Sequence, residues 1–238
     1  MIAAVATVRG DTDIAPLSVA HLFAEGVDVV YIATHDEIAH RVLEDSGAIL
    51  VPRRDHYWHQ QRWVNELAAI AGANGADWIV PFDADEFWFG EDGLSVAEAL
   101  STVPVEIPVA AATLWQYATW EYRQAEPERE MFKVAYRFDP QVRLGFGGHD
   151  LEQPKGLPCI QGVVRLRHLP YRSYSHFKSK VRDACLTLPP EIRTAGYGRH
   201  HTCLEHADEA ELRNYWEHWL SLGAIRDPIP IESLQMFT

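Results

Sequence analysis

Short apolar runs alternate with helical patterns over the first 82 residues, and this order limits the possible folds more than any other feature of the chain. The predicted elements are strand, helix, strand, helix, strand, helix and strand: residues 2–8, 16–25, 27–33, 37–45, 48–51, 57–74 and 78–82. Such an alternation predicts a parallel sheet with right-handed crossovers. Ligands of these sheets bind at the carboxyl ends of the strands. We therefore expect an α/β fold with its site at that edge.

The second half of the chain predicts a change of architecture. Its elements are a short helix, four strands and two helices: residues 93–100, 109–120, 132–138, 141–146, 162–169, 171–188 and 208–222. Strands that follow one another in this way favour mixed or antiparallel pairing. At 238 residues the chain has the length of one large α/β domain. We expect a mostly parallel central sheet with a mixed or antiparallel second half and C-terminal helices.

Composition excludes several classes of partner and location. The 21 Lys and Arg residues face 34 Asp and Glu residues, and the net charge of −13 predicts a surface that repels nucleic acid. The three cysteines form no Cys-x-x-Cys pair and predict reduced thiols. The N-terminus lacks a basic leader, and no apolar run reaches the ~18 residues of a transmembrane segment. These features predict a cytoplasmic protein.

The most informative stretch is Asp77 to Trp88, where an apolar run ends in three acids. Asp83, Asp85 and Glu86 follow the predicted strand 78–82 directly. If the segment is extended, alternation places Asp83 and Asp85 on one side and Glu86 on the other. Two neighbouring carboxylates suit Mg²⁺ or Mn²⁺ with diphosphate oxygens completing the shell. A solvated turn or a helix N-cap is the simpler alternative, but the aromatic residues 87–89 favour a ligand pocket.

Polar groups also gather where the predicted helix 57–74 begins. Arg53, Arg54 and Arg62 could neutralise a diphosphate, and Asp55 and Gln61 could hold a base or ribose. A surface helix with a polar first turn is the alternative. No Gly-x-Gly-x-x-Gly follows the first strand and no Gly-Lys-Ser/Thr is present, which argues against a dinucleotide-binding domain and a P-loop.

Two segments of the second half carry further candidate groups. The Gly-rich loop 145–152 holds Asp150 and Glu152, and such loops close readily over ligands, although most are ordinary turns. His168 lies at the end of the strand 162–169, and we expect it near the same sheet edge as Asp85. A neutral imidazole is a competent third ligand for Mn²⁺ beside carboxylates.

Three segments together resemble glycosyltransferase family 2 type enzymes of the GT-A fold, particularly bacterial members. They are residues 6–9, residues 60–65 leading into the Asp-Ala-Asp-Glu-Phe-Trp motif that ends at Trp88, and residues 167–173 running into residues 177–181. The resemblance implies a GT-A (Rossmann-like) nucleotide-diphospho-sugar transferase fold as a single domain over residues 1–238. Its parts would be a nucleotide-binding half (1–90), an acceptor-side half (91–205) and a C-terminal helical segment (206–238).

The resemblance also implies a metal site. Asp85 would bind the metal that bridges the diphosphate, and Asp83 would share this metal or contact the ribose. His168 would complete the metal shell. The implied cofactor is Mn²⁺ or Mg²⁺.

Nucleotide contacts are implied at the first two strand ends. Thr7 and Arg9 match the loop that borders the base, and Asp36 lies where such enzymes place an acid for the base or ribose. The chain departs from the family pattern at Asp11, where many relatives carry an Asn-Glu pair, and at residues 34–36, where they carry a longer Asp-rich segment. These departures leave UDP-, GDP- and dTDP-linked donors all open.

The expected reaction is transfer of a sugar from a nucleotide-diphosphate donor to a carbohydrate or other hydroxyl acceptor, with inversion. An inverting transferase needs a carboxylate to take the proton of the acceptor hydroxyl. We expect Asp150 in this role, with Glu86 and Glu152 as rivals. A nucleotidyltransferase, in which two carboxylates hold two metals, is the first alternative. A non-catalytic module that binds nucleotide sugars is the second, and the sequence predicts no oligomeric state.

Overall fold

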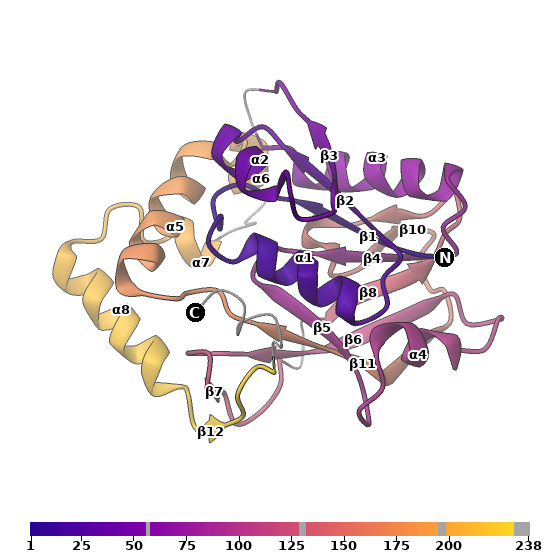
Figure 1. Cartoon of the computed structure of the whole chain (residues 1–238). Coiled ribbons are helices and arrows are strands. Elements are labelled where there is room, and N and C mark those ends of the chain that lie inside the picture. The colour runs from indigo at the N-terminus through magenta and orange to yellow at the C-terminus, as the bar shows by residue number, and fades with distance from the viewer. Residues whose placement is uncertain (56–57, 129–131, 195–198, 231–238) are drawn as a thin grey trace.

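The computed structural model of the chain describes residues 1–55, 58–128, 132–194 and 199–230 (Figure 1). Its helices are α1 Ala15–Ala24, α2 Glu37–Leu43, α3 Gln60–Ala73, α4 Val96–Ser101, α5 Tyr174–Thr187, α6 Pro190–Thr194, α7 Arg199–Thr202 and α8 Glu209–Ser221, with the short 3₁₀ helix η1 Phe146–Gly148. Its strands are β1 Ile2–Thr7, β2 Val29–Thr34, β3 Ile49–Pro52, β4 Trp78–Phe82, β5 Glu86–Gly90, β6 Val109–Gln116, β7 Tyr122–Arg123, β8 Phe132–Arg137, β9 Arg143–Leu144, β10 Leu151–Gln153, β11 Cys159–His168 and β12 Ile225–Arg226.

Eight of these strands form one central sheet in the order β3-β2-β1-β4-β8-β6-β11-β5. The first four are parallel to one another. β8 runs antiparallel to both β4 and β6, β11 is parallel to β6, and β5 is antiparallel to β11. The predicted α/β class is confirmed: six of the eight strands run in one direction, and both antiparallel strands come after the βαβ half of the chain.

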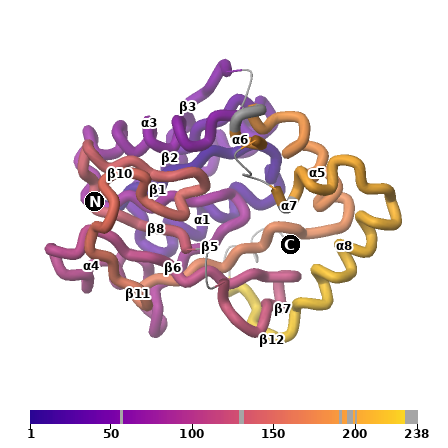
Figure 2. The backbone as a smooth tube through the Cα atoms, turned by 180° about the vertical axis from the view of Figure 1, so that it is seen from behind, coloured from indigo at the N-terminus to yellow at the C-terminus, as the bar shows by residue number. Residues whose placement is uncertain are grey.

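The parallel half of the sheet is buried on both faces, so β1 is apolar up to Thr7 and β4 is apolar throughout. In β1, Ala4 and Ala6 pack in a core with α1, α2 and α4, whereas Ala3 and Val5 pack in a second core with α3. α1 lies in front of the sheet in Figure 1, and the hairpin of β9 and β10 lies in front when the molecule is seen from behind in Figure 2. This two-sided burial explains why β1 shows no polar alternation.

A third apolar cluster lies beyond the carboxyl ends of the parallel strands. It joins α5 to α8 and consists mainly of aromatic side chains: Tyr171, Tyr174, Phe177, Val181, Leu204, Leu212, Tyr215, Trp216 and Trp219. In Figure 1 these helices stand to the left of the sheet, on the side opposite the N-terminus. The C-terminal helices therefore flank the edge at which the site was expected.

The ladder between β4 and β8 is short, and this opens space at the carboxyl end of β4. Only Trp78 and Ile79 of β4 pair with β8, whereas β4 pairs with β1 along its full length. Pro81 has no N–H to offer to a neighbouring strand. Gly148 lies in this opening with φ of +69°, and a Cβ there would come 3.2 Å from Pro81 and 3.4 Å from the Lys133 side chain.

Three expectations from the sequence are wrong. Residues 141–146 do not join the central sheet, because only β9 is a strand and it pairs with β10. The strand expected at 109–120 ends at Gln116. The aromatic residues 87–89 do not line a pocket: they form β5, an edge strand whose residues are all buried between β11 and the helices α1 and α4.

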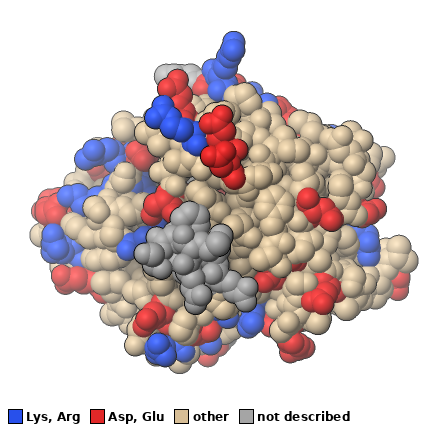
Figure 3. All heavy atoms as spheres, in the orientation of Figure 1, with Lys and Arg blue, Asp and Glu red and all other residues tan. Residues whose placement is uncertain are grey.

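Among the described residues, each helix is too short or too polar to cross a bilayer. On the face drawn in Figure 3, Lys and Arg side chains are interspersed with Asp and Glu and do not form one continuous basic area.

Candidate functional site

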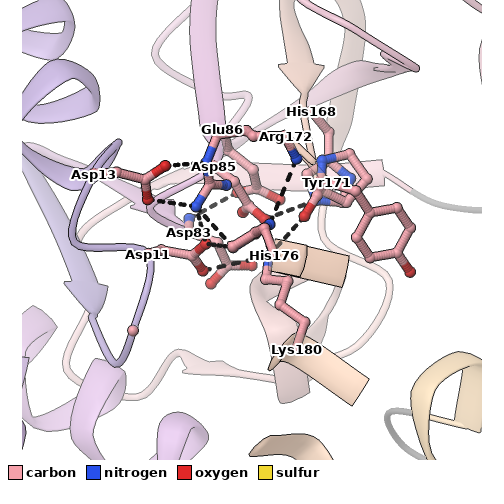
Figure 4. Close-up of polar contacts among 12 residues, drawn as sticks. Asp11, Asp13, Asp83, Asp85, Glu86, His168, Tyr171, Arg172, His176 and Lys180 are labelled. Atoms are coloured by element: carbon pink, nitrogen blue, oxygen red, sulfur yellow. Dashed lines mark hydrogen bonds and ion pairs between the residues drawn. The ribbon is translucent and has the colours of Figure 1, made fainter. Parts of the chain in front are cut away.

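Charged side chains from six segments meet at the carboxyl edge of the parallel strands (Figure 4). β1, β4 and β11 run toward this edge and end there, whereas β8 and β5 run away from it and begin there. The residues brought together are Asp11 and Asp13 after β1, Asp83 and Asp85 after β4, Glu86 at the start of β5, Lys133 at the start of β8, His168 at the end of β11, and Arg172, His176 and Lys180 at α5. We call this set the charged cluster.

Residues 83–86 form a turn, which corrects the expected alternation of their side chains. The N–H of Glu86 donates to the carbonyl of Asp83 at 3.0 Å, and the N–H of Asp83 donates to the Glu86 carboxylate at 2.8 Å. Because the backbone turns here, Asp83 and Glu86 point to one partner and Asp85 to another. The two aspartates therefore do not share one side of an extended strand.

Lys133 is the common partner of Asp83 and Glu86. Its Nζ lies 2.6 Å from a carboxylate oxygen of each, and its side chain is 1% exposed. Gln60 donates to the other oxygen of Asp83 at 2.8 Å. Burial raises the pKa of Glu86 to about 7 although Lys133 acts in the opposite direction. Burial by itself lowers the pKa of Lys133, but the two carboxylates outweigh it and raise this pKa, so Lys133 stays charged.

Asp85 lies between Lys180 and His168. Lys180 donates to its Oδ2, and Nε2 of His168 lies 3.6 Å from the same oxygen. Burial alone would raise the pKa of Asp85, but the charges of Lys180 and His168 hold it well below its usual range. Burial lowers the pKa of His168, but Asp85 outweighs this effect and raises it. Asp85 is therefore an ionised carboxylate with 5% of its side chain exposed.

Asp11 connects the loop after β1 to helix α5. Its carboxylate accepts from Arg172 at 2.7 Å and contacts Nε2 of His176 at 2.9 Å, and Nζ of Lys180 lies 3.3 Å away. Arg172 also bonds both carboxylate oxygens of Asp13 at 2.7 Å. Asp11 has φ of +49°, a conformation that Asp tolerates better than most residues. These contacts fix the position of α5 against the sheet edge.

The predicted nucleotide residues near β1 and β2 lie beside the cluster but do not contact it. Asp36 caps α2 by accepting from the N–H groups of Ile38 and Ala39, and it also accepts from Gly10 at 3.1 Å. Burial raises the pKa of Asp36, but these three backbone donors outweigh it and lower it. Thr7 is buried, and its hydroxyl has no hydrogen-bond partner among the described residues. Arg9 is half-buried after β1.

On α3 the predicted residues lie away from the cluster. Arg62 forms an exposed ion pair with Asp55 at 2.6 Å. Gln61 donates to the carbonyl of Leu144 and to the carboxylate of Glu152. Its neighbour Gln60, which the sequence analysis did not select, is the residue that reaches Asp83.

The candidate bases differ in their exposure. Asp150 is exposed at the end of the loop that contains η1, and its carboxylate lies against Gly145. The loop is anchored beside the cluster, because Gly148 packs near Lys133 and Nδ1 of His149 donates to the carbonyl of Phe132 at 2.8 Å. Glu152 is exposed, whereas Glu86 is 2% exposed.

Several members of the cluster had not been assigned a role from the sequence. Lys133 is a buried charged residue among the apolar residues of β8, and its side chain must find a buried carboxylate or leave the core. His176 and Lys180 are four residues apart on α5 and so share one helix face. Both patterns were available as signals, but neither specifies which acid is the partner.

The donor set fits a metal that arrives with its substrate. Over the described residues, no three or more His, Cys, Asp or Glu side chains are arranged to hold an ion. Asp85 and His168 supply two donors that face each other across 3.6 Å. Mg²⁺ and Mn²⁺ are commonly held by one or two protein carboxylates and the phosphates of a substrate. Asp85 and His168 could therefore contribute part of a metal shell, and the described residues form no complete cage.

Comparisons with known proteins leave the activity open. No family model matches the chain, and a search of curated proteins finds no match. Among solved structures, it is similar to a candidate glucose-1-phosphate thymidylyltransferase from Bacillus anthracis in complex with a sucrose, at 13% identity over 91% of this chain and 82% of that chain with a TM-score of 0.33. A CMP:2-keto-3-deoxy-manno-octonic acid synthetase complexed with CTP matches at 16% identity over 87% and 85%, with a TM-score of 0.34. Similarity at this level assigns no activity to the chain.

Proposed function

We propose that this chain is a metal-dependent glycosyltransferase that moves a sugar from a nucleotide-diphosphate donor to an acceptor hydroxyl, with inversion. One observation carries the proposal: at the carboxyl edge of the parallel strands, Asp85 and His168 face each other beside the ammonium of Lys180. A carboxylate–imidazole pair suits Mn²⁺ or Mg²⁺, and a lysine beside it suits an anionic leaving group.

The charge of the cluster supports a requirement for a divalent cation. Five carboxylates face two ammonium groups and one guanidinium: Asp11, Asp13, Asp83, Asp85 and Glu86 against Lys133, Lys180 and Arg172. The carboxyl groups therefore outnumber the permanently charged cations of the cluster. A diphosphate would be repelled from such a site unless a cation came with it.

Each residue then has a defined task. Asp85 and His168 would hold the ion, which when bound stabilises the negative charge of the departing nucleoside diphosphate. Lys180 donates to diphosphate oxygens. Arg172 holds Asp11 and so keeps α5 against the sheet edge. Lys133 and Gln60 hold Asp83 in place, where it contacts the donor's ribose or shares the ion.

We assign the general base to Asp150. A base must reach the acceptor hydroxyl, and Asp150 is exposed on a loop that is anchored beside the cluster. Glu86 is buried, and its contacts with Lys133 and with the Asp83 N–H are internal. In this assignment Glu86 is a positioning residue for the turn at 83–86.

The nucleoside would lie at the ends of β1 and β2. Thr7, Arg9 and Asp36 border this region, with Asp55 in the segment before α3 and Gln61 and Arg62 in the first turn of α3. The buried hydroxyl of Thr7, which lacks a partner among the described residues, supports this placement.

Donor hydrolysis tests the proposal. UDP-, GDP- and dTDP-sugars are incubated with the protein and Mn²⁺, without and with a panel of hydroxyl acceptors. Release of the nucleoside diphosphate and formation of the glycosylated acceptor are measured for wild type, Asp85→Asn and Asp150→Asn. We expect slow hydrolysis of one donor class, loss of at least ~100-fold in Asp85→Asn, and retained donor hydrolysis but lost transfer in Asp150→Asn. Asp85→Asn with wild-type hydrolysis would refute the metal assignment, and near-normal transfer by Asp150→Asn would refute the base.

One observation favours a nucleotidyltransferase as second candidate. Asp11 and Asp85 both lie within reach of the Lys180 ammonium, and two acids that share one cation could instead share a pair of metal ions. The products separate the two reactions. A nucleotidyltransferase makes pyrophosphate from a nucleoside triphosphate and a sugar phosphate, whereas a glycosyltransferase releases a nucleoside diphosphate. Metal-independent binding of the donor without turnover would indicate a non-catalytic module.

A further inference from the structure

Lys180 occupies the atom of Asp85 that an incoming metal ion would need. Its ammonium donates to Oδ2 of Asp85, and His168 faces the same oxygen from 3.6 Å. A lysine ammonium and a divalent ion on one carboxylate oxygen repel each other, so the ion binds Asp85 more weakly while Lys180 stays in place. Displacement of Lys180 therefore strengthens binding of an ion between Asp85 and His168.

We propose that Lys180 is an internal counter-cation that keeps Asp85 closed to a metal ion until a nucleotide diphosphate is present. This inference rests on the function proposed above. The diphosphate draws the Lys180 ammonium away from Asp85. The Asp85 carboxylate, no longer paired with Lys180, can then bind the ion. Metal and nucleotide binding are thereby coupled through one side chain.

The movement leaves none of the charged groups without a partner. Lys180 already lies 3.3 Å from Asp11 and donates to the carbonyl of Pro170 at 3.1 Å. When it turns away, Asp11 keeps its contacts with Arg172 and His176. The lysine side chain is a flexible chain of four carbons, so its ammonium can shift by several ångströms while α5 stays fixed.

Lys133 shows what a non-exchanging lysine looks like in the same cluster. Its side chain is 1% exposed and is enclosed by Asp83, Glu86 and Gly148. The side chain of Lys180 is 20% exposed, at the solvent side of the cluster. Access to solvent and to a ligand therefore distinguishes the exchangeable lysine from the structural one.

Manganese binding tests this inference without measuring activity. Mn²⁺ affinity is determined by electron paramagnetic resonance of the free ion, alone and with UDP, GDP or dTDP, for wild type, Lys180→Met and Lys178→Met. Lys178 is the matched control, because it lies on the same helix and pairs with the surface acid Glu209. We expect Lys180→Met to bind Mn²⁺ alone about ten-fold tighter than wild type, and to gain correspondingly less from the nucleotide. Lys178→Met should behave as wild type.

Lys180→Gln and a thermal-shift measurement cover the case in which Lys180→Met folds poorly. Mn²⁺ alone should raise the melting temperature of either Lys180 variant more than that of wild type. The inference is overturned if the Lys180 variants bind Mn²⁺ alone no tighter than wild type does. A wild type in which none of UDP, GDP and dTDP tightens Mn²⁺ binding overturns the proposed function. Tighter Mn²⁺ binding by the variants would still identify Lys180 as the counter-cation of Asp85.

Discussion

Lowering the pH should destabilise the protein through His21, a buried residue of α1. His21 is 5% exposed, its Nε2–H donates to the carbonyl of Trp88 at 2.6 Å, and its ring contacts Phe87 and Phe89 with centroids 5.6 Å and 4.5 Å away. Burial lowers the pKa of this imidazole to about 4, although the bond to Trp88 acts in the opposite direction. His21 therefore stays neutral in the folded protein at a pH where it is protonated in the unfolded chain.

The sign and size of the effect follow from this difference. Between pH 6.5 and pH 4 the unfolded chain binds one proton more at His21 than the folded protein does, so stability falls as the pH falls. The loss in the free energy of unfolding amounts to about 2 kcal/mol at pH 5 and about 3 kcal/mol at pH 4. Above pH 6.5 both states are neutral at His21, and the contribution is constant.

Urea unfolding at pH 7, 5 and 4 measures this effect in wild type, His21→Gln and the control His218→Gln. Glutamine keeps an N–H donor for Trp88 but does not titrate, and His218 is exposed on α8. We expect the difference in unfolding free energy between wild type and His21→Gln to shift by about 3 kcal/mol from pH 7 to pH 4. A difference that stays constant within about 1 kcal/mol refutes the reasoning, because every other titrating group is common to both proteins.

Three further outcomes are expected. Lys133→Met should lower the free energy of unfolding by about 3–5 kcal/mol, because it leaves Glu86 buried without its cation. Adding Glu86→Gln should restore part of the loss. A loss below about 1 kcal/mol in urea unfolding would contradict this expectation. We expect Asp150 and not Glu86 to act as the base, so Glu86→Gln should keep the wild-type dependence of kcat/KM on pH. If Glu86 were the base, kcat/KM of the wild type would rise with pH up to about 7, the raised pKa of Glu86, and Glu86→Gln would lose this rise. Chelation with EDTA should abolish donor hydrolysis, and Mn²⁺ or Mg²⁺ should restore it; unchanged hydrolysis in EDTA argues against a metal.

The parallel half of the fold could be predicted because its information is local. Each strand from β1 to β4 is a short apolar run, and each is separated from the next by a helix with its own apolar period. The predicted elements of this half agree with the observed ones to within a few residues. The direction of the strands also predicts that polar residues gather at the carboxyl edge of the sheet.

β5 was missed because burial on both faces removes the alternation that marks a strand. Phe87, Trp88 and Phe89 are all buried, so the segment has no polar face and was interpreted as the lining of a pocket. The turn at 83–86 could not be predicted for a related reason, because side chains alternate only along an extended chain. In both places the sequence specifies apolarity and charge but not the backbone conformation.

The pairing within the charged cluster could not be predicted, because its partners are distant in sequence. Lys133 is 50 residues from Asp83, and Lys180 is 95 residues from Asp85. Local periodicity places a lysine on a strand or a helix face, but only the order of strands in the sheet decides which acid it meets. The sequence therefore predicts a site rich in carboxylates, but only the structure shows that Lys133 and Lys180 pair with them.

Mixed strand direction explains how so many charged residues reach one place. In an all-parallel sheet, the carboxyl edge receives only the last residue of each strand and the loop that follows. Here β8 and β5 run in the opposite direction, so their first residues, Lys133 and Glu86, lie at the same edge as the last residues of β4 and β11. Because Pro81 ends the β4–β8 ladder early, Lys133 can turn into the opening and hold Asp83 from inside the sheet. β8 therefore supplies the buried, permanent cation of the cluster. The more exposed Lys180 is the cation that a ligand can displace.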